Sequence, residues 1–195
     1  MAEVGASQNF IARAIGSWAK SVTLQHHLDR MGGKPSNSLQ YQIARKFVIS
    51  KVKQALGFDR CLTFSSGAAP MNIDTKRYFL SLDIPINDIF GMSECSGGHS
   101  FSKIDAPSFE TIGKALQTLQ TQIRNPDKTG TGEIFIKGRH VMAGYLEDSD
   151  NTLKTIDENG WLATGDIGYI DNDGYIFITG RIKEIIITAG YNNYF

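Results

Sequence analysis

The sequence has few cysteines and no net charge, and each shortage excludes a class of protein. Its two cysteines, Cys61 and Cys95, show neither zinc-binding nor CxxC spacing, so neither a disulfide framework nor a structural zinc site is indicated. Lysine and arginine total 20, and so do aspartate and glutamate. Binding to a nucleic-acid backbone requires clustered surplus cations, so we expect no nucleic-acid partner.

Long apolar segments are also absent. The longest apolar runs, such as residues 185–187, fall far short of the roughly 20 residues that cross a bilayer. Residues 2–10 have no basic start and no apolar core, so they do not read as a signal peptide. Because the two thiols form no disulfide framework, we expect an intracellular, cytoplasmic protein. The surface of the endoplasmic reticulum membrane is an alternative location that does not follow from the thiols. Hydrophobic residues still make up 41% of the 195 residues, which is enough for a packed core.

The first predicted element is an amphipathic helix over residues 11–31. Apolar side chains recur there at helical spacing, namely Ile11, Ile15, Trp18 and Val22. The Gly-Gly-Lys-Pro sequence at residues 32–35 ends the pattern. We expect the apolar face to lie in the core, and the alternative is a helix that lies on a membrane surface, giving a peripheral membrane contact.

A second helix is predicted from about Ser38 to Leu56. Asn37 and Gln40 resemble a capping box at its start, and Gly57 is a natural stop. Its apolar stripe consists of Ile43, Phe47 and Val48.

The next segments predict an α/β fold with a parallel sheet. Residues 60–64 are a candidate buried strand, residues 85–90 a second strand, and a helical pattern lies between them. Loops of small residues follow both strands, at residues 65–70 and 91–98. This strand–helix–strand order is typical of parallel sheets, whose ligands bind at the carboxyl ends of the strands.

After Thr111 the sequence becomes rich in β patterns. Residues 133–137 alternate with period two, and residues 167–170 and 175–178 flank an Asp-Asn-Asp-Gly turn, as in a hairpin. We therefore divide the chain into an α/β portion at residues 1–110, a β-rich subdomain at residues 111–180, and the start of a further element at residues 181–195.

The two small-residue loops carry the first candidate site residues. The loop over residues 65–70, with Gly67, Ala68 and Ala69, lets a planar ring or a phosphate approach the backbone, although an ordinary tight turn has the same composition. Phe90 offers a stacking face. Glu94 offers a carboxylate suited to Mg²⁺ beside phosphates, and a solvated loop glutamate is the plainer interpretation.

Two further pieces lie in the β-rich part. Asp166 follows a glycine, and a carboxylate in this position can accept hydrogen bonds from both hydroxyls of a ribose. The plainer interpretation is an aspartate that caps a turn. Arg181 and Lys183 form a cation pair just past a predicted strand, as a charged hairpin end also would. His99 and His140 show no partner in the sequence, so we assign them no role.

Five motifs together, in this order, are what distinguish the sequence. They are SSGAAP at residues 65–70, FGMSE at 90–94, GEIFIKGRHVMAGY at 132–145, WLATGD at 161–166 and GRIKEIIITAG at 180–190. In this order they resemble the adenylate-forming superfamily of acyl-CoA synthetases, luciferases and peptide-synthetase adenylation domains. Within it, the WAKSVTL, LGFDRC and GRHVMAGY segments are similar to long-chain acyl-CoA synthetases of the bubblegum type.

The resemblance implies an ATP-dependent ligase that joins a fatty acid to AMP and then exchanges AMP for the thiol of CoA, with Mg²⁺ bound to ATP. It implies a barrel-like arrangement for the β-rich part and a stub of the C-terminal lid domain at residues 181–195. The small-molecule partners are then a fatty acid, ATP and CoA, and the oligomeric state stays open.

The resemblance also implies roles for individual residues. The nucleotide would contact Gly67, Ala68 and Ala69 on one face of adenine and Phe90 on the other, together with Gly91, Met92, Asp166 and Arg181. Ser93 would lie near the α-phosphate, Glu94 would bind the metal, and Lys183 would lie at the hinge of the lid. Ser93, Glu94 and Lys183 are thus the predicted catalytic residues.

Some expected parts of the family pattern are absent from this sequence. The phosphate-gripping Ser/Thr/Gly-rich loop would lie upstream, and the lid lysine would lie past Phe195. Residues 190–195 do not follow the family pattern. Gln117, Thr118 and Leu119 replace a usual Pro-Gly turn, so we expect a distorted entry into the β-rich part. We therefore expect a partial chain that is inactive alone.

Two alternatives to the fatty acid ligase stay open. One is a non-catalytic fragment that binds nucleotide or a partner weakly, with exposed apolar surface. The other is an adenylate-forming enzyme for aryl or amino acids, because most of the wall of an acyl pocket is not in this sequence.

Overall fold

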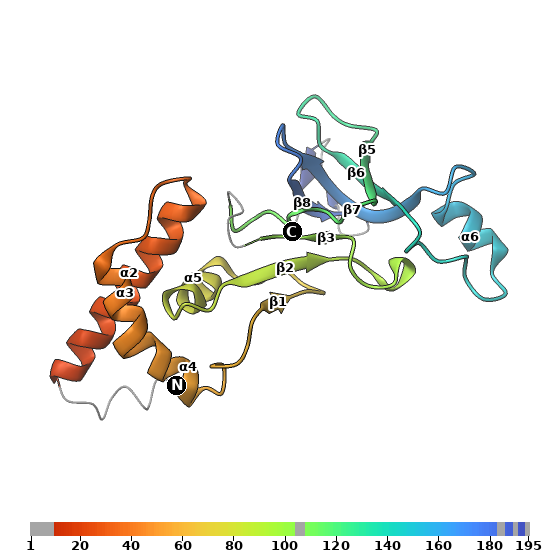
Figure 1. The fold of residues 1–195 in the computed structure, drawn as a ribbon. Helices are drawn as coiled ribbons and strands as arrows, with labels where there is room; N and C mark the ends of the chain where they lie inside the picture. Colours follow the sequence, from red (N-terminus) through yellow and green to blue (C-terminus); the bar gives the residue numbers. More distant parts are fainter. Residues whose placement is uncertain (1–9, 104–107, 183–185, 189–190, 194–195) are drawn as a thin grey trace. The chain divides into compact units, whose positions relative to one another are not determined.

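The structure is a computed structural model that describes residues 10–103, 108–182, 186–188 and 191–193. Figure 1 shows the order of its helices and strands. The chain divides into two compact units. Unit 1 contains residues 1–65, 71–87 and 104–109, and unit 2 contains residues 66–70, 88–103 and 110–195. We describe each unit by itself.

Both predicted N-terminal helices are confirmed in unit 1. Helix α2 spans Phe10–Met31. The second helix forms as three successive segments, α3 over Leu39–Ala44, a π-helical turn over Arg45–Ile49 and α4 over Ser50–Ala55. Its N-cap is Ser38, whose side chain accepts a hydrogen bond from Tyr41 N, so the predicted cap at Asn37 is wrong by one residue. Gly57 follows the helix end with a φ of 73°, as predicted.

The face that α2 buries is only partly the predicted one, because Val22 alone of the four predicted apolar residues packs against the buried cluster of Ala19, Ala44 and Ile49. Its buried residues are Ala19, Thr23, His26 and His27, and α2 packs with this face against α3 and α5. The predicted apolar face is largely exposed, with Ile11 at 62%, Ile15 at 47% and Trp18 at 39%. His26 is accommodated inside because it finds partners there: its Nδ1 hydrogen-bonds to the carbonyl of Ser36, and its ring stacks on Tyr41. The membrane-surface interpretation of the exposed face stays a prediction.

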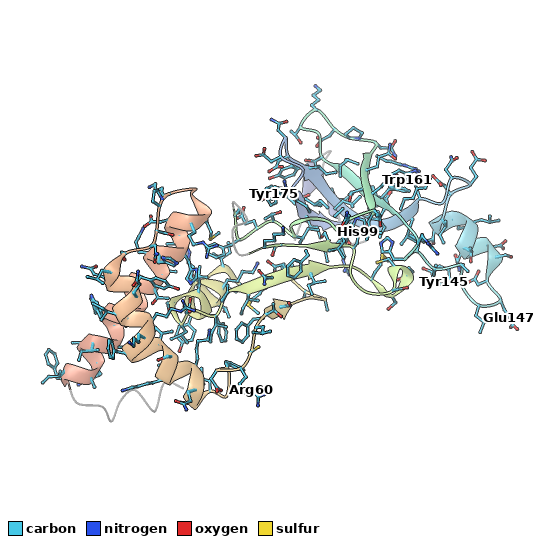
Figure 2. The ribbon with its side chains drawn as sticks, in the orientation of Figure 1. Arg60, His99, Tyr145, Glu147, Trp161 and Tyr175 are labelled. Carbon is cyan, nitrogen blue, oxygen red and sulfur yellow. The ribbon has the colours of Figure 1, made fainter. Side chains whose placement is uncertain are left out.

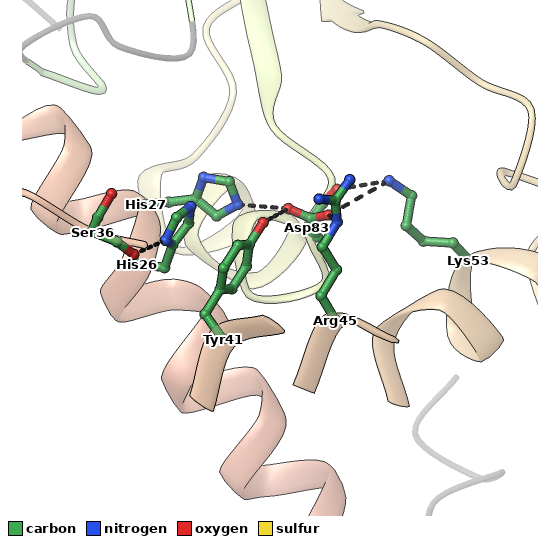
Figure 3. A network of polar contacts seen from close by, with 7 residues as sticks. All are labelled: His26, His27, Ser36, Tyr41, Arg45, Lys53 and Asp83. Atoms are coloured by element: carbon green, nitrogen blue, oxygen red, sulfur yellow. Dashed lines mark hydrogen bonds and ion pairs between the residues drawn. The ribbon is translucent and has the colours of Figure 1, made fainter. Parts of the chain in front are cut away.

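A buried carboxylate joins the helices of unit 1 (Figure 3). Asp83 accepts hydrogen bonds at Oδ1 from His27 Nε2 at 2.9 Å and from Tyr41 Oη at 3.1 Å. Lys53 Nζ donates to the Asp83 carbonyl at 3.0 Å, and Arg45 Nε lies 3.4 Å from Asp83 Oδ2. A single residue just past α5 therefore ties α2, α3 and α4 together.

The predicted strand–helix–strand order is present as β1 over Phe64–Ser66, α5 over Ile73–Ser81 and β2 over Ile86–Phe90. β1 and β2 are neighbours in a four-stranded sheet of order β1-β2-β3-β4, in which β3 is Ser100–Phe101 and β4 is Lys114–Ala115. The division between the units falls within β1 and β2. The predicted buried strand at residues 60–64 is wrong for residues 60–63, which precede β1 and are exposed, Leu62 by 95%.

A second sheet, of order β5-β6-β7-β8, forms the core of unit 2. It consists of β5 at Gln120–Arg124, β6 at Gly132–Lys137, β7 at Leu162–Ile170 and β8 at Ile176–Arg181, all paired antiparallel. The period-two pattern buries Ile134 and Ile136 as predicted. The predicted hairpin is confirmed, with Ile170 paired to Ile176 across the turn.

In the residues that the structure describes, the β-rich part is an open sheet with β5 and β8 as its two edges, and the predicted barrel-like arrangement stays a prediction. Unit 2 also contains one short helix and two short strands outside this sheet. Helix α6 spans Ser149–Thr155 and is capped by Asp148. Strands β9 at Ile186–Thr188 and β10 at Tyr191–Asn193 pair antiparallel in a two-stranded sheet of their own. The predicted lid stub covers this region and stays a prediction.

The expected distortion at residues 117–119 is confined to one residue. Thr118 has a φ of 74°, in the left-handed region, and Leu119 N donates to the Leu116 carbonyl at 3.0 Å to close the turn. The pairing of β5 with β6 then starts at Gln120 opposite Lys137 and continues without a register shift. None of the described helices has the length and hydropathy that a membrane-spanning helix requires.

Candidate functional site

The four sequence-predicted groups of site residues that the structure describes all lie in unit 2. Lys183 is outside the described residues. The loop after β1 contains Gly67, Ala68 and Ala69, all exposed. Ala68 has a φ of 70°, which is strained for a residue with a Cβ. A Cβ on Gly67 would lie only 3.2 Å from the Ile89 carbonyl oxygen. This loop therefore lies directly against the carboxyl end of β2.

The second loop leaves β2 at Phe90, which is half-buried, and turns sharply at Gly91. A Cβ on Gly91 would lie 1.4 Å from the Gly97 carbonyl oxygen, so only glycine fits there. One 3₁₀ turn over Ser93–Cys95 follows, and Ser96 ends it in the left-handed conformation. The turn leaves Ser93 exposed and Glu94 half-buried. We call residues 91–99 the Glu94 loop.

Cys95 anchors the Glu94 loop to the second sheet. Its side chain is fully buried in one cluster with Ile134, Ile136, Leu162 and Ile176, against which Met92 also packs. Burial raises the pKa of the Cys95 thiol, so this cysteine is an apolar anchor and not a nucleophile. Because Leu162 belongs to the WLATGD motif, the FGMSE and WLATGD motifs share a core.

The carboxylate of Glu94 has a partner that the sequence did not reveal. Tyr145 Oη donates to Glu94 Oε1 at 2.8 Å, and Met142 N donates to the Glu94 carbonyl at 2.8 Å. Figure 2 labels Tyr145 in the segment between β6 and α6. The bond to Glu94 raises the pKa of Tyr145, so the phenol stays a hydrogen-bond donor at neutral pH. We call residues 138–145 the Tyr145 loop.

Asp166 and Arg181 form a cross-strand pair. They face each other in the register of β7 and β8, and Arg181 Nε donates to Asp166 Oδ1 at 2.9 Å. The Asp166 side chain is only 8% exposed, whereas that of Arg181 is 61% exposed. Gly165 has a φ of 74°, and the pairing with β6 shifts register at this point. The glycine before Asp166 therefore lies in a β-bulge inside a strand, and such bulges redirect side chains near functional sites.

A histidine pair, left unassigned from the sequence, joins the end of the Glu94 loop to the Tyr145 loop. His99 Nδ1 is 3.1 Å from His140 Nε2, and His99 Nε2 is 2.7 Å from Thr121 Oγ1. His99 is completely buried. Burial lowers the pKa of His99 to about 4, with the neighbouring His140 acting in the same direction, so His99 is neutral at physiological pH.

The residues present fit a magnesium ion carried by a nucleotide. Within the described part of the chain, no group of three or more His, Cys, Asp or Glu side chains could enclose a metal ion. Mg²⁺ in phosphate-binding sites is usually held by one or two carboxylates together with substrate phosphates and water. Glu94, half-buried and held through one carboxylate oxygen, is suited to that arrangement.

Comparison with known proteins defines the class. A family model described as AMP-binding enzyme matches residues 22–146, which is more than half of the chain. The chain therefore belongs to the AMP-binding enzyme family. Among curated relatives it is similar to the long-chain-fatty-acid–CoA ligase ACSBG2 of Xenopus laevis, with 47% identity over 193 residues and 99% of this chain covered. The human long-chain-fatty-acid–CoA ligase ACSBG1 is 43% identical over 98% of this chain.

The chain spans about a quarter of the length of these relatives, 26% in both cases. Among solved structures, ATP-bound MatB from Rhodopseudomonas palustris matches with a TM-score of 0.63 and 30% identity, covering 73% of this chain and 29% of that one. A fatty acyl CoA synthetase of Mycobacterium tuberculosis matches with a TM-score of 0.56 and 27% identity, covering 72% and 32%. The bubblegum-type resemblance of the sequence is thereby confirmed.

Proposed function

We propose that unit 2 forms the adenine, ribose and magnesium side of the active site of an ATP-dependent long-chain fatty acid:CoA ligase. The observation that carries the proposal is the convergence of four motifs in one compact unit. The Gly67 loop adjoins β2, the Glu94 loop shares a core with the WLATGD strand, and Asp166 pairs with Arg181. The relatives named above are long-chain-fatty-acid–CoA ligases, and the MatB structure contains ATP.

In this proposal the nucleotide base lies between the loop of Gly67, Ala68 and Ala69 and the ring of Phe90. Phenylalanine supplies a stacking face but no hydroxyl. The backbone of Gly91 and Met92 borders the same site, and Ser93 lies near the α-phosphate. This assignment is supported by the exposed, strained loop at Ala68 and by its close approach to Ile89.

In the same proposal the charged residues bind the ribose and the phosphates. Asp166 accepts the ribose hydroxyls, and Arg181, which already holds Asp166 in place, contacts the ribose or a phosphate. Glu94 binds the Mg²⁺ of Mg·ATP, and that metal screens the negative charge that an approaching carboxylate meets. Lys183 is proposed to lie at the hinge of a lid whose rotation separates adenylation from thioester formation with CoA.

The proposal is tested by palmitate-dependent release of pyrophosphate from ATP. We suggest two proteins: the 195-residue chain alone, and the Xenopus laevis relative in which residues 10–182 of this chain replace the matching segment. Activity of the substituted enzyme with palmitate, and none with aryl or amino acids, supports the proposal. A substituted enzyme that folds, binds no ATP and forms no acyl-adenylate overturns it.

The same assay separates the alternatives. If the 195-residue chain alone binds ATP but releases no pyrophosphate, the non-catalytic interpretation holds for the isolated chain, while the site assignment stands. Preference of the substituted enzyme for an aryl or amino acid would favour an adenylate-forming enzyme of another substrate class. The names of the relatives favour the fatty acid.

A further inference from the structure

Two loops of unit 2 are joined by a set of hydrogen bonds around the candidate metal ligand. The Tyr145 loop donates from Met142 N to the Glu94 carbonyl and from Tyr145 Oη to the Glu94 carboxylate, each at 2.8 Å. In return, Ser96 Oγ of the Glu94 loop donates to the His140 carbonyl at 3.1 Å. Two of these three contacts, those made by the exposed residues Ser96 and Tyr145, lie at the edge of the loops.

The buried contact between the same loops is the imidazole pair. His99 ends the Glu94 loop and is 0% exposed, and its ring stacks on that of His140 with centroids 5.2 Å apart and planes 22° apart. Its two nitrogens reach His140 Nε2 at 3.1 Å and Thr121 Oγ1 at 2.7 Å. His99 N also donates to the Phe90 carbonyl at 2.7 Å, which closes the base of the Glu94 loop.

A neutral imidazole pair makes a directional bond, because one ring donates and the other accepts. Burial lowers the pKa of both histidines, so neither ring carries a charge that the interior would penalise. An apolar side chain in place of either ring would leave the other with an unpaired buried nitrogen, and this costs more than the bond itself contributes.

We propose that His99 and His140 are positioning residues that fix the Glu94 loop against the Tyr145 loop and so set the orientation of the Glu94 carboxylate toward Mg·ATP. The role of Glu94 in this inference rests on the proposed function. The coupling between the two loops is independent of the proposed function. Neither histidine touches the nucleotide in this account; both act through the backbone of residues 94–99 and 140–142 and through the Tyr145 hydroxyl.

The loop coupling is tested on the 195-residue chain by hydrogen exchange at the Met142 amide. We compare His140→Leu, which cannot pair with His99, with His140→Gln, whose amide group reproduces the hydrogen bonding at Nε2. Thr121→Val is a milder variant that removes only the outer partner of His99, and it keeps the test valid if His140→Leu does not fold. Exchange should accelerate at least tenfold in His140→Leu, less in Thr121→Val and not in His140→Gln.

The functional step is tested in the substituted Xenopus enzyme by titrating Mg²⁺ at fixed ATP and palmitate. His140→Leu should raise the Mg²⁺ concentration for half-maximal activity about tenfold, and His140→Gln should restore it to within about twofold. In a Glu94→Gln background, His140→Leu should add no further increase. Unchanged Met142 exchange in His140→Leu overturns the coupling, and an equal increase with and without Glu94 overturns the positioning role. If the proposed function is wrong, the substituted enzyme without further mutations will be inactive, whereas the change in Met142 hydrogen exchange in His140→Leu will still be observed.

Discussion

Tyr145 and Glu94, 51 residues apart in sequence, are joined by a hydrogen bond of 2.8 Å from the phenol to the carboxylate. The bond engages one carboxylate oxygen and orients the group before any ligand arrives. A preoriented ligand binds a metal more tightly because less conformational freedom is lost on binding.

The first prediction follows from this pair. In the substituted enzyme, Tyr145→Phe should raise the Mg²⁺ requirement about five- to tenfold, equivalent to roughly 1 kcal/mol for one lost hydrogen bond. The maximal rate at saturating Mg²⁺ should change little, because the phenol does not contact the reacting atoms. Tyr169→Phe is the matched control, since that ring stacks on Phe177 and Phe retains the stacking. An equal effect of both substitutions would contradict the assignment.

Gly91 gives the second prediction. Gly91→Ala places a Cβ 1.4 Å from the Gly97 carbonyl oxygen, so the backbone of the Glu94 loop must move. We expect a loss of ATP binding of at least tenfold, measured by fluorescence titration with an ATP analogue. Gly16→Ala is the control, because no atom lies within 4 Å of a Cβ at that helical position, and it should stabilise the chain by up to ~1 kcal/mol. Wild-type ATP binding by Gly91→Ala would show that the loop is not the nucleotide site.

Asp83 gives the third prediction, on stability and pH. Burial alone would raise its pKa, but the hydrogen bond from His27 and the nearby charges lower it. The folded pKa therefore lies below the unfolded value of about 3.9. The unfolded chain then binds more protons, so the contribution of Asp83 is complete above about pH 3.9 and is lost as pH falls through the folded pKa.

The measurement is chemical unfolding of Asp83→Asn and of the wild type over a pH series. At pH 7 the substitution should cost about 1–3 kcal/mol, because it leaves buried partners unsatisfied. The difference between the two proteins should shrink on acidification. Asp74→Asn is the control: its side chain is 90% exposed and lies 3.9 Å from Arg77, so the effect should be small. A difference that stays constant down to pH 3 would rule out the ionised network.

Thr118 gives the fourth prediction. A β-branched residue with a φ of 74° is strained, so Thr118→Gly should stabilise the chain by roughly 1 kcal/mol despite the added freedom of glycine in the unfolded state. Thermal unfolding measures it. Gln117→Gly, at a neighbouring position without a positive φ, should not stabilise. A lower unfolding temperature for Thr118→Gly would show that this turn is not strained.

Local patterns predicted the elements of the fold where one period was sustained. The alternation at residues 133–137 and the turn chemistry at residues 171–174 identified β6 and the β7–β8 hairpin. The strand at residues 60–64 was misplaced because a short apolar run does not show where sheet pairing begins. Most of the buried face of α2 was missed because His26 and His27 are buried through hydrogen bonds to residues outside the helix, Ser36 and Asp83.

The residue types and the order of the candidate site come from the sequence and stay a prediction, whereas the contacts between these residues came only from the structure. Sequence could not show that Tyr145 pairs with Glu94, or His99 with His140, because such pairs depend on which loops the sheet brings together. Arg181 was predicted as a nucleotide contact, and its bond to Asp166 appeared only with the register of β7 and β8.

We propose above that this chain supplies the magnesium and ribose side of an acyl-adenylating site. The most direct test is palmitate-dependent exchange of pyrophosphate into ATP by the substituted Xenopus enzyme, with and without Glu94→Gln. We predict clear exchange in the unmodified protein and a loss of at least a hundredfold at physiological Mg²⁺ in Glu94→Gln, partly recovered at high Mg²⁺. Equal exchange by both proteins would contradict the account.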